Sequence, residues 1–154
     1  MNQKVSIIGA GMTGSTTAQW IASREIADIV LVDIVEGMPQ GKALDLQEAL
    51  PIIGKDVKIT GSNNYEATQD SDIVIITAGL PRKPGMSRDD LLFTNADIVR
   101  KATEETTKYA PNAIFIILTN PLDVMSYVAL KTAQIAPHKI IGQAGILDSA
   151  RMRA

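Results

Sequence analysis

Residues 5–14 read VSIIGAGMTG, and this stretch decides the fold of the 154-residue chain. An apolar, β-branched run of the kind that forms a buried strand leads directly into three glycines spaced G-x-G-x-x-G. A helical stretch follows to residue 23, and the next apolar run, at 29–32, ends on Asp33, 19 positions after Gly14. Strand, glycine turn, helix, strand and acid in this order are typical of a dinucleotide-binding βαβ unit.

The residues of the glycine turn have separate physical roles in such a unit. Gly9 permits the tight turn, Gly11 lets the backbone approach a pyrophosphate, and Gly14 lets the helix pack against the strand. Free N–H groups at the start of the helix would bind the phosphates. The predicted cofactor-binding turn therefore comprises Gly9, Ala10, Gly11, Met12, Thr13 and Gly14.

Asp33 predicts which dinucleotide binds. Its carboxylate would accept hydrogen bonds from both hydroxyls of the adenosine ribose, and the same charge would repel a 2′-phosphate. The next residues, Ile34, Val35 and Glu36, offer no cation that could bind such a phosphate. The cofactor is therefore predicted to be NAD rather than NADP. The alternative is a structural glycine turn followed by an ordinary acidic strand end.

The rest of the chain alternates short apolar runs with helical stretches. Further strands are predicted at 73–76 and 113–118, with weaker candidates at 57–60 and 139–141. Helices are predicted at 40–50, at 121–133 and from Ser87, a good N-cap, to Pro111. This pattern predicts an α/β fold with a doubly wound parallel sheet, in the Rossmann strand order 3-2-1-4-5-6, and helices on both faces.

Composition limits the partners of the chain. With 45% hydrophobic residues and a net charge of -2, neither nucleic acid nor an anionic membrane is an expected partner. No apolar run approaches the roughly 20 residues that a membrane span needs. The absence of cysteine excludes disulfides and thiolate metal sites, and it fits a reducing compartment. We expect a soluble, cytoplasmic protein without a metal.

Several separated motifs resemble the lactate and malate dehydrogenase family, and together they cover essentially the whole chain. They are VDIVEG at 32–37 with GKALDL at 41–46, PRKPGMSR at 81–88, TNPLD at 119–123 and GQAGILDSAR at 142–151. The resemblance is greatest to the lactate-dehydrogenase-like malate dehydrogenases. It implies an NAD-dependent oxidoreductase of the tricarboxylic acid cycle, which converts (S)-malate and NAD to oxaloacetate and NADH by hydride transfer.

The resemblance implies a substrate site for a small dicarboxylate. Arg151 would bind the C1 carboxylate as a bidentate fork, and Arg88 would stabilise the developing oxyanion. Arg82 stands where lactate enzymes carry glutamine and would pair with the distal carboxylate. This difference favours malate over lactate, because an unpaired carboxylate is costly to bury. Any one arginine, like Lys83, could instead be a solvated surface charge.

The resemblance also implies positions beside the nicotinamide. Asn120 would hydrogen-bond the substrate there, and the Asn120–Pro121 bond is a candidate cis peptide. Asn95, Leu118 and Thr119 match family positions that line the cofactor.

Asp148 matches the family residue that orients a catalytic histidine. The one histidine in the chain, His138, precedes a strand and is predicted to be an ordinary loop residue. Residues 147–154 read as a helix that has just begun. We therefore expect residues 1–145 to form an NAD-binding domain, and residues 146–154 to begin the helix leading to a substrate domain. The chain alone would then bind NAD without turnover.

The sequence leaves alternative functions of the chain open. A stand-alone NAD(H)-sensing module would use the same glycines and Asp33, but not the arginines. Tyr127 and Lys131 match the Y-x-x-x-K pair of short-chain dehydrogenases, which we interpret as coincidence because the glycine spacing differs.

The loop at 79–86, with two prolines, two glycines and two cations, favours a lid over a plain connection. Apolar residues on more than one face of 41–50 fit either a homo-oligomer contact or burial within the domain.

Overall fold

The computed structural model describes residues 3–81 and 84–154, apart from the side chain of Arg88. Six parallel strands form one sheet in the order β3-β2-β1-β4-β5-β6. The strands are β1 (Lys4–Ile8), β2 (Asp28–Val32), β3 (Ile59–Ser62), β4 (Ile73–Ile76), β5 (Ile114–Ile117) and β6 (Ile140–Gly142). The predicted fold class and strand order are both confirmed.

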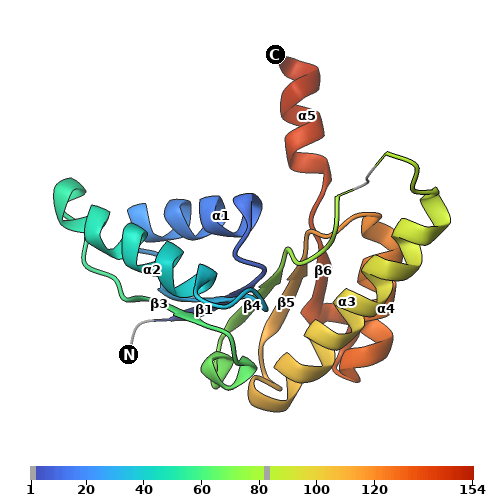
Figure 1. Cartoon of the computed structure of the whole chain (residues 1–154), viewed down its shortest axis with the longest axis horizontal. Helices are drawn as coiled ribbons and strands as arrows, with labels where there is room; N and C mark the ends of the chain where they lie inside the picture. The colour runs from blue at the N-terminus through green and yellow to red at the C-terminus, as the bar shows by residue number, and fades with distance from the viewer. Residues whose placement is uncertain (1–2, 82–83) are drawn as a thin grey trace.

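Helices cover both faces of the sheet (Figure 1). On one face lie α1 (Met12–Ser23) and α2 (Met38–Ala49), and on the other lie α3 (Arg88–Tyr109) and α4 (Leu122–Ala133). A fifth helix, α5 (Gly145–Arg153), projects away from the sheet, and none of its nine residues is buried. Short 3-10 turns occupy Leu50–Ile53, Tyr65–Thr68 and Pro137–Lys139.

The sheet separates two hydrophobic cores, which explains the continuous apolar runs in the sequence. In β2, Ile29 and Leu31 belong to the core beneath α1 and α2, whereas Val30 and Val32 belong to the core beneath α3 and α4. Successive side chains of a strand point to opposite faces, so a strand covered on both sides is apolar at every position.

The strand β3 begins and ends two residues later than one of the two weaker strand candidates predicted from the sequence. The sequence pattern favours 57–60, but β3 spans Ile59–Ser62. Gly61 lies so close to α2 that a Cβ atom there would overlap the carbonyl group of Pro39. Packing against α2 thus extends the strand into a glycine and a serine, which carry no strand signal.

The start of α3 follows the sequence prediction. Ser87 Oγ accepts a hydrogen bond from the Asp90 N–H at 3.0 Å, and the Ser87 N–H donates to Asp90 Oδ2 at 3.3 Å. This capping box stabilises the first turn of the helix. It also fixes the backbone of Arg88, the first helical residue, at the end of the loop 79–86.

Within residues 3–81 and 84–154, no helix is both long and apolar enough to cross a membrane. The same part of the chain contains no group of three or more His, Cys, Asp or Glu side chains that could hold a metal ion.

Candidate functional site

The glycine turn lies between β1 and α1, at the carboxyl edge of the sheet. Gly9 has a φ of 104°, in the left-handed region, and a Cβ there would lie 2.7 Å from Thr77 Oγ1 and 2.8 Å from the Ala78 nitrogen. A Cβ at Gly14 would overlap the carbonyl oxygen of Gly9. Both positions therefore require glycine, one for the turn and the other for the packing of α1.

Gly11 has open space where the other two glycines are crowded. A Cβ there would meet nothing within 4 Å in the described chain. Gly11 is the N-cap of α1, and no described side chain caps this helix end. The first N–H groups of the helix thus remain available to an anion that approaches the backbone closely. Met12 and Thr13, the first helical residues, are exposed.

Asp33 follows β2 and faces the glycine turn. Its Oδ2 accepts a hydrogen bond from the Ala10 N–H at 2.7 Å, and its Oδ1 accepts one from the Val35 N–H at 3.0 Å. Asp33 is half-buried, and each carboxylate oxygen can accept more than one hydrogen bond. The carboxylate is therefore held in place with acceptor capacity to spare.

The electrostatic surroundings of Asp33 include a neighbouring tyrosine. Burial raises the pKa of the Tyr65 hydroxyl above its usual value, and the negative charges of Glu105 and Asp33 act in the same direction. The Tyr65 hydroxyl therefore lies within electrostatic reach of the Asp33 carboxylate.

Asn95 connects the segment that follows β4 with the segment that follows β5, on the opposite side of the glycine turn from Asp33. It lies on α3 and is only 2% exposed. Its Oδ1 accepts from the Leu80 N–H at 2.8 Å, and its Nδ2 donates to the Asn120 carbonyl at 2.9 Å. Thr119, also buried, donates from Oγ1 to the Ala78 carbonyl at 2.8 Å. The segments that follow β4 and β5 are thereby held together as one wall of the site.

The structure describes only some of the other residues predicted for the site. The Asn120–Pro121 peptide bond is cis, as predicted, and Leu118 packs against the core beneath α1 and α2. Arg82 and Lys83 lie outside the described residues, as does the side chain of Arg88. The interpretation of residues 79–86 as a lid stays a prediction.

Asp148 and Arg151, the two remaining predicted site residues, lie together on α5. Arg151 Nη1 is 3.2 Å from Asp148 Oδ1, and the two side chains are 68% and 73% exposed. Each is therefore paired with the other, and both remain accessible. An exposed pair of this kind contributes little to stability, so a substrate or another side chain could replace either partner at small cost.

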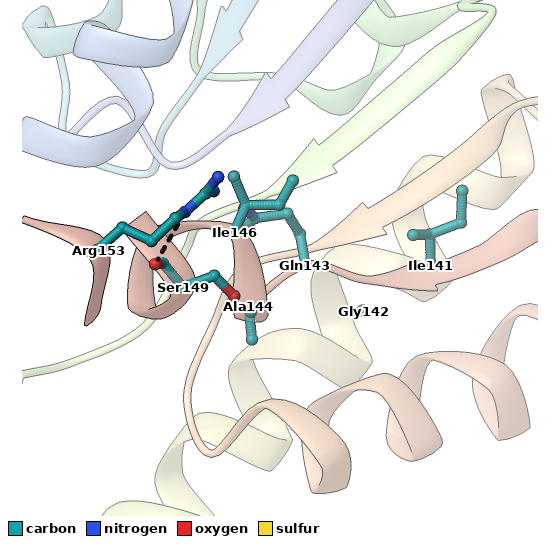
Figure 2. Close-up of a pocket in the computed structure, with 8 residues that line it drawn as sticks. Ile141, Gly142, Gln143, Ala144, Ile146, Ser149 and Arg153 are labelled. Carbon is teal, nitrogen blue, oxygen red and sulfur yellow. Dashed lines mark hydrogen bonds between the residues drawn. The ribbon is translucent and has the colours of Figure 1, made fainter. Parts of the chain in front are cut away.

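An open hollow of about 510 Å³ lies where β6 ends and α5 begins (Figure 2). Arg153 Nε donates to the Ser149 carbonyl at 3.4 Å beside it. The hollow is lined by Ile141, Gly142, Gln143, Ala144, Gly145, Ile146, Ser149 and Arg153. It therefore opens at the carboxyl end of β6, at the same edge of the parallel sheet as the glycine turn.

His138 and the pair Tyr127 and Lys131, which the sequence analysis set aside as catalytic residues, lie elsewhere. His138 is exposed in the turn Pro137–Lys139, which precedes β6 and so lies at the amino edge of the sheet. The prediction that His138 belongs to a connection before a strand is confirmed. Lys131 Nζ lies 5.3 Å from the centre of the Tyr127 ring, and both residues are exposed on α4. They form a surface cation–π pair.

Sequence reasoning missed the contacts of two residues in the segment that follows β4, although Gly79 belongs to the loop at 79–86 that it singled out. Thr77 Oγ1 donates to the Gly9 carbonyl at 3.0 Å and so supports the glycine turn. A Cβ at Gly79 would lie 2.6 Å from Thr119 Cγ2, so only glycine lets the two loops approach this closely. The available signal was their position within three residues of the end of a strand, at the edge where parallel sheets bind ligands.

The sequence matches a known family over most of its length. Residues 3–142 match the family described as lactate/malate dehydrogenase, NAD binding domain. The malate dehydrogenase of Thermomicrobium roseum is 60% identical over 154 residues, which are 100% of this chain and 50% of that protein. The chain spans about half the length of the curated relatives it matches.

Solved structures show the same similarity. The malate dehydrogenase of Cryptosporidium parvum is 52% identical, with a TM-score of 0.94, over 99% of this chain and 49% of that one. The lactate dehydrogenase of the same organism, solved with lactic acid and nicotinamide adenine dinucleotide, is 43% identical, with a TM-score of 0.93. That match covers 99% of this chain and 48% of the other.

Proposed function

This chain belongs to the lactate and malate dehydrogenase family, and on that premise we propose that it is the NAD-binding part of an NAD-dependent malate dehydrogenase. The observation that carries the proposal is the placement of Asp33 against the glycine turn, with Oδ2 bonded to the Ala10 N–H. A carboxylate there suits a ribose diol and repels a 2′-phosphate. The space in front of Gly11 suits the approach of a pyrophosphate.

The described residues divide the binding of NAD between two sides of the site. The first N–H groups of α1 would bind the pyrophosphate, and Asp33 would bind the adenosine ribose. Leu118, Thr119 and Asn95 would form the wall beside the nicotinamide. When bound, the nicotinamide supplies the hydride acceptor for the oxidation of (S)-malate at C2 to oxaloacetate.

The substrate part of the proposal rests on three arginines and an amide. Arg151 would bind the carboxylate next to the reacting carbon, Arg82 the distal carboxylate, and Arg88 the developing oxyanion. Asn120 would hydrogen-bond the substrate. The 68% exposed side chain of Arg151 and the open hollow at the base of α5 support this arrangement. The name shared by the curated relatives supports malate over lactate.

No histidine lies at the carboxyl edge of the sheet, where it could act as the general base of the proposed reaction. His138 is the only histidine in the sequence and lies at the opposite edge. We propose that Asp148 orients a histidine from a substrate domain that follows a boundary near residue 145. The absence of any buried residue in α5 supports this division. By itself, the 154-residue chain would bind NAD(H) without turnover.

Oxaloacetate-dependent oxidation of NADH by the purified chain tests this proposal. We expect the chain to bind NADH, detected by its fluorescence, but to show no oxidation above the uncatalysed rate. Loss of a general acid or base alone lowers rates by about 10² to 10⁴. With NADH bound, oxaloacetate should bind detectably and pyruvate should not.

Three results would contradict the proposal. Turnover of oxaloacetate would show that the general base lies within these residues. A response to pyruvate alone would assign the substrate site to a 2-oxo acid without a second carboxylate. Saturable NADH binding with no response to either acid would favour an NAD(H)-sensing module.

A homo-oligomer also remains a proposal, supported by the faces of α2. Ala43 is buried within the domain, whereas Leu44 is 59% exposed on the same helix. Part of the apolar pattern at 41–50 therefore serves the domain core, and the exposed part remains available to a second copy of the chain.

A further inference from the structure

The turn that presents Asp33 has no apolar anchor of its own. Residues 34–37 are all exposed, with Ile34 at 83% and Val35 at 53%. Gly37 has a φ of 75°, a conformation in which glycine adds no side-chain contact. A turn without buried side chains depends on polar contacts for its conformation.

Asn63 supplies the side-chain contacts of this kind, beside backbone hydrogen bonds from the Met38 N–H to the Val35 carbonyl and from the Asp33 N–H to the Ser62 carbonyl, both at 3.2 Å. It directly follows β3, and its Nδ2 donates to the Asp33 carbonyl at 2.8 Å and to the Val35 carbonyl at 2.9 Å. Its Oδ1 accepts a hydrogen bond from Gln40 Nε2, on α2, at 2.7 Å. One amide therefore ties the end of β2, the turn after it and α2 to a single point.

The contacts of Asn63 reach the Asp33 carboxylate through one intervening residue. Val35 donates its N–H to Asp33 Oδ1, and its carbonyl is one of the two groups that Asn63 binds. Asn63 thus holds the donor that orients one carboxylate oxygen, while the Ala10 N–H orients the other.

We propose that Asn63, held by Gln40, is a positioning residue that sets the preference of this chain for NAD over NADP by fixing the turn that aims the Asp33 carboxylate at the adenosine ribose. The inference rests on the proposed binding of NAD at Asp33. Hydrogen bonds to a ribose need the carboxylate within a few tenths of an ångström of one place. Repulsion of a 2′-phosphate also weakens with distance and with screening by solvent. A loosened turn therefore weakens NADH binding and the exclusion of NADPH together.

The test compares Asn63→Ala and Gln40→Ala with Asn64→Ala in the full 154-residue chain. Asn64 is the matched control, since it is the exposed neighbour of Asn63 and only its backbone takes part in the described hydrogen bonds. The dissociation constants of NADH and NADPH are measured by fluorescence titration, and the melting temperature is measured alongside.

We expect Asn63→Ala to weaken NADH binding by about tenfold, the equivalent of one to two lost hydrogen bonds. We also expect it to reduce the ratio of the NADPH and NADH dissociation constants by about fivefold. Gln40→Ala should change both values in the same direction by less, while Asn64→Ala should leave them within about twofold.

An unchanged ratio of dissociation constants in Asn63→Ala, with a lower melting temperature, would overturn the inference, because a merely structural role lowers stability without changing the preference. If Asn63→Ala does not fold, Gln40→Ala decides, and an unchanged ratio there has the same meaning. Failure of the unmodified chain to bind NADH would instead overturn the proposed function, and the inference with it.

Discussion

Replacing Asp33 with asparagine is expected to weaken NADH binding by about 10- to 100-fold, because hydrogen bonds to a charged acceptor contribute about 1.5–3 kcal/mol. The amide keeps the shape of the side chain, so an oxygen can still accept from the Ala10 N–H. NADPH binding should strengthen in the same variant, because the repulsion of its 2′-phosphate is removed. Fluorescence titration with both dinucleotides measures the two effects.

Glu36→Gln is the matched control for this prediction. Glu36 is an exposed acid on the same turn, and its replacement changes the net charge of the chain by the same amount. We expect its affinities for NADH and NADPH to stay within about twofold of the original values, since charges screened by solvent act weakly. Unchanged NADH affinity in Asp33→Asn would mean that the adenosine ribose does not bind at Asp33.

Replacing Gly14 with alanine is expected to lower the melting temperature by about 6 °C or more. The new Cβ would overlap the carbonyl oxygen of Gly9, which is backbone and cannot rotate away. Either α1 or the glycine turn must shift, at a cost of about 3 kcal/mol or more. For a domain of this size, each kcal/mol lowers the melting temperature by about 2–4 °C. Thermal unfolding followed by circular dichroism measures the change.

Gly11→Ala is the matched control, because its Cβ would meet no atom of the described residues within 4 Å. Gly11 has a φ of -67°, which alanine adopts without strain. Its melting temperature should stay within about 2 °C of the original, while NADH binding weakens because the methyl group occupies the approach of the pyrophosphate. Equal melting temperatures for Gly14→Ala and Gly11→Ala would show that the packing of α1 does not depend on Gly14.

The sequence predicted those features that are set locally or by repeated patterns. The two-faced apolar strands, the turn at Gly9 and the capping of α3 by Ser87 each depend on residues close together in the chain, and the structure confirms them. The position of Asp33 beside the turn was predictable because the βαβ unit brings the ends of adjacent parallel strands together.

The features that sequence reasoning missed depend on contacts between distant segments. The bond from Gln40 to Asn63 joins residues 23 apart, and neither residue belongs to a recognised motif. Thr77 reaches the Gly9 carbonyl across 68 positions. The displacement of β3 follows from the close approach of Gly61 to Pro39, which no pattern along the strand reveals. Such contacts become visible only when the sheet and its helices are assembled.

The assignment of an NAD site to the glycine turn and Asp33 is tested most directly by titrating the unmodified chain with NADH and, separately, with NADPH. We predict saturable binding of NADH at one site per chain, at least about tenfold tighter than that of NADPH, since one charged hydrogen-bond acceptor accounts for a difference of that size. No saturable NADH binding would contradict the assignment of a cofactor site to the glycine turn. Equal or tighter binding of NADPH would contradict the role of Asp33.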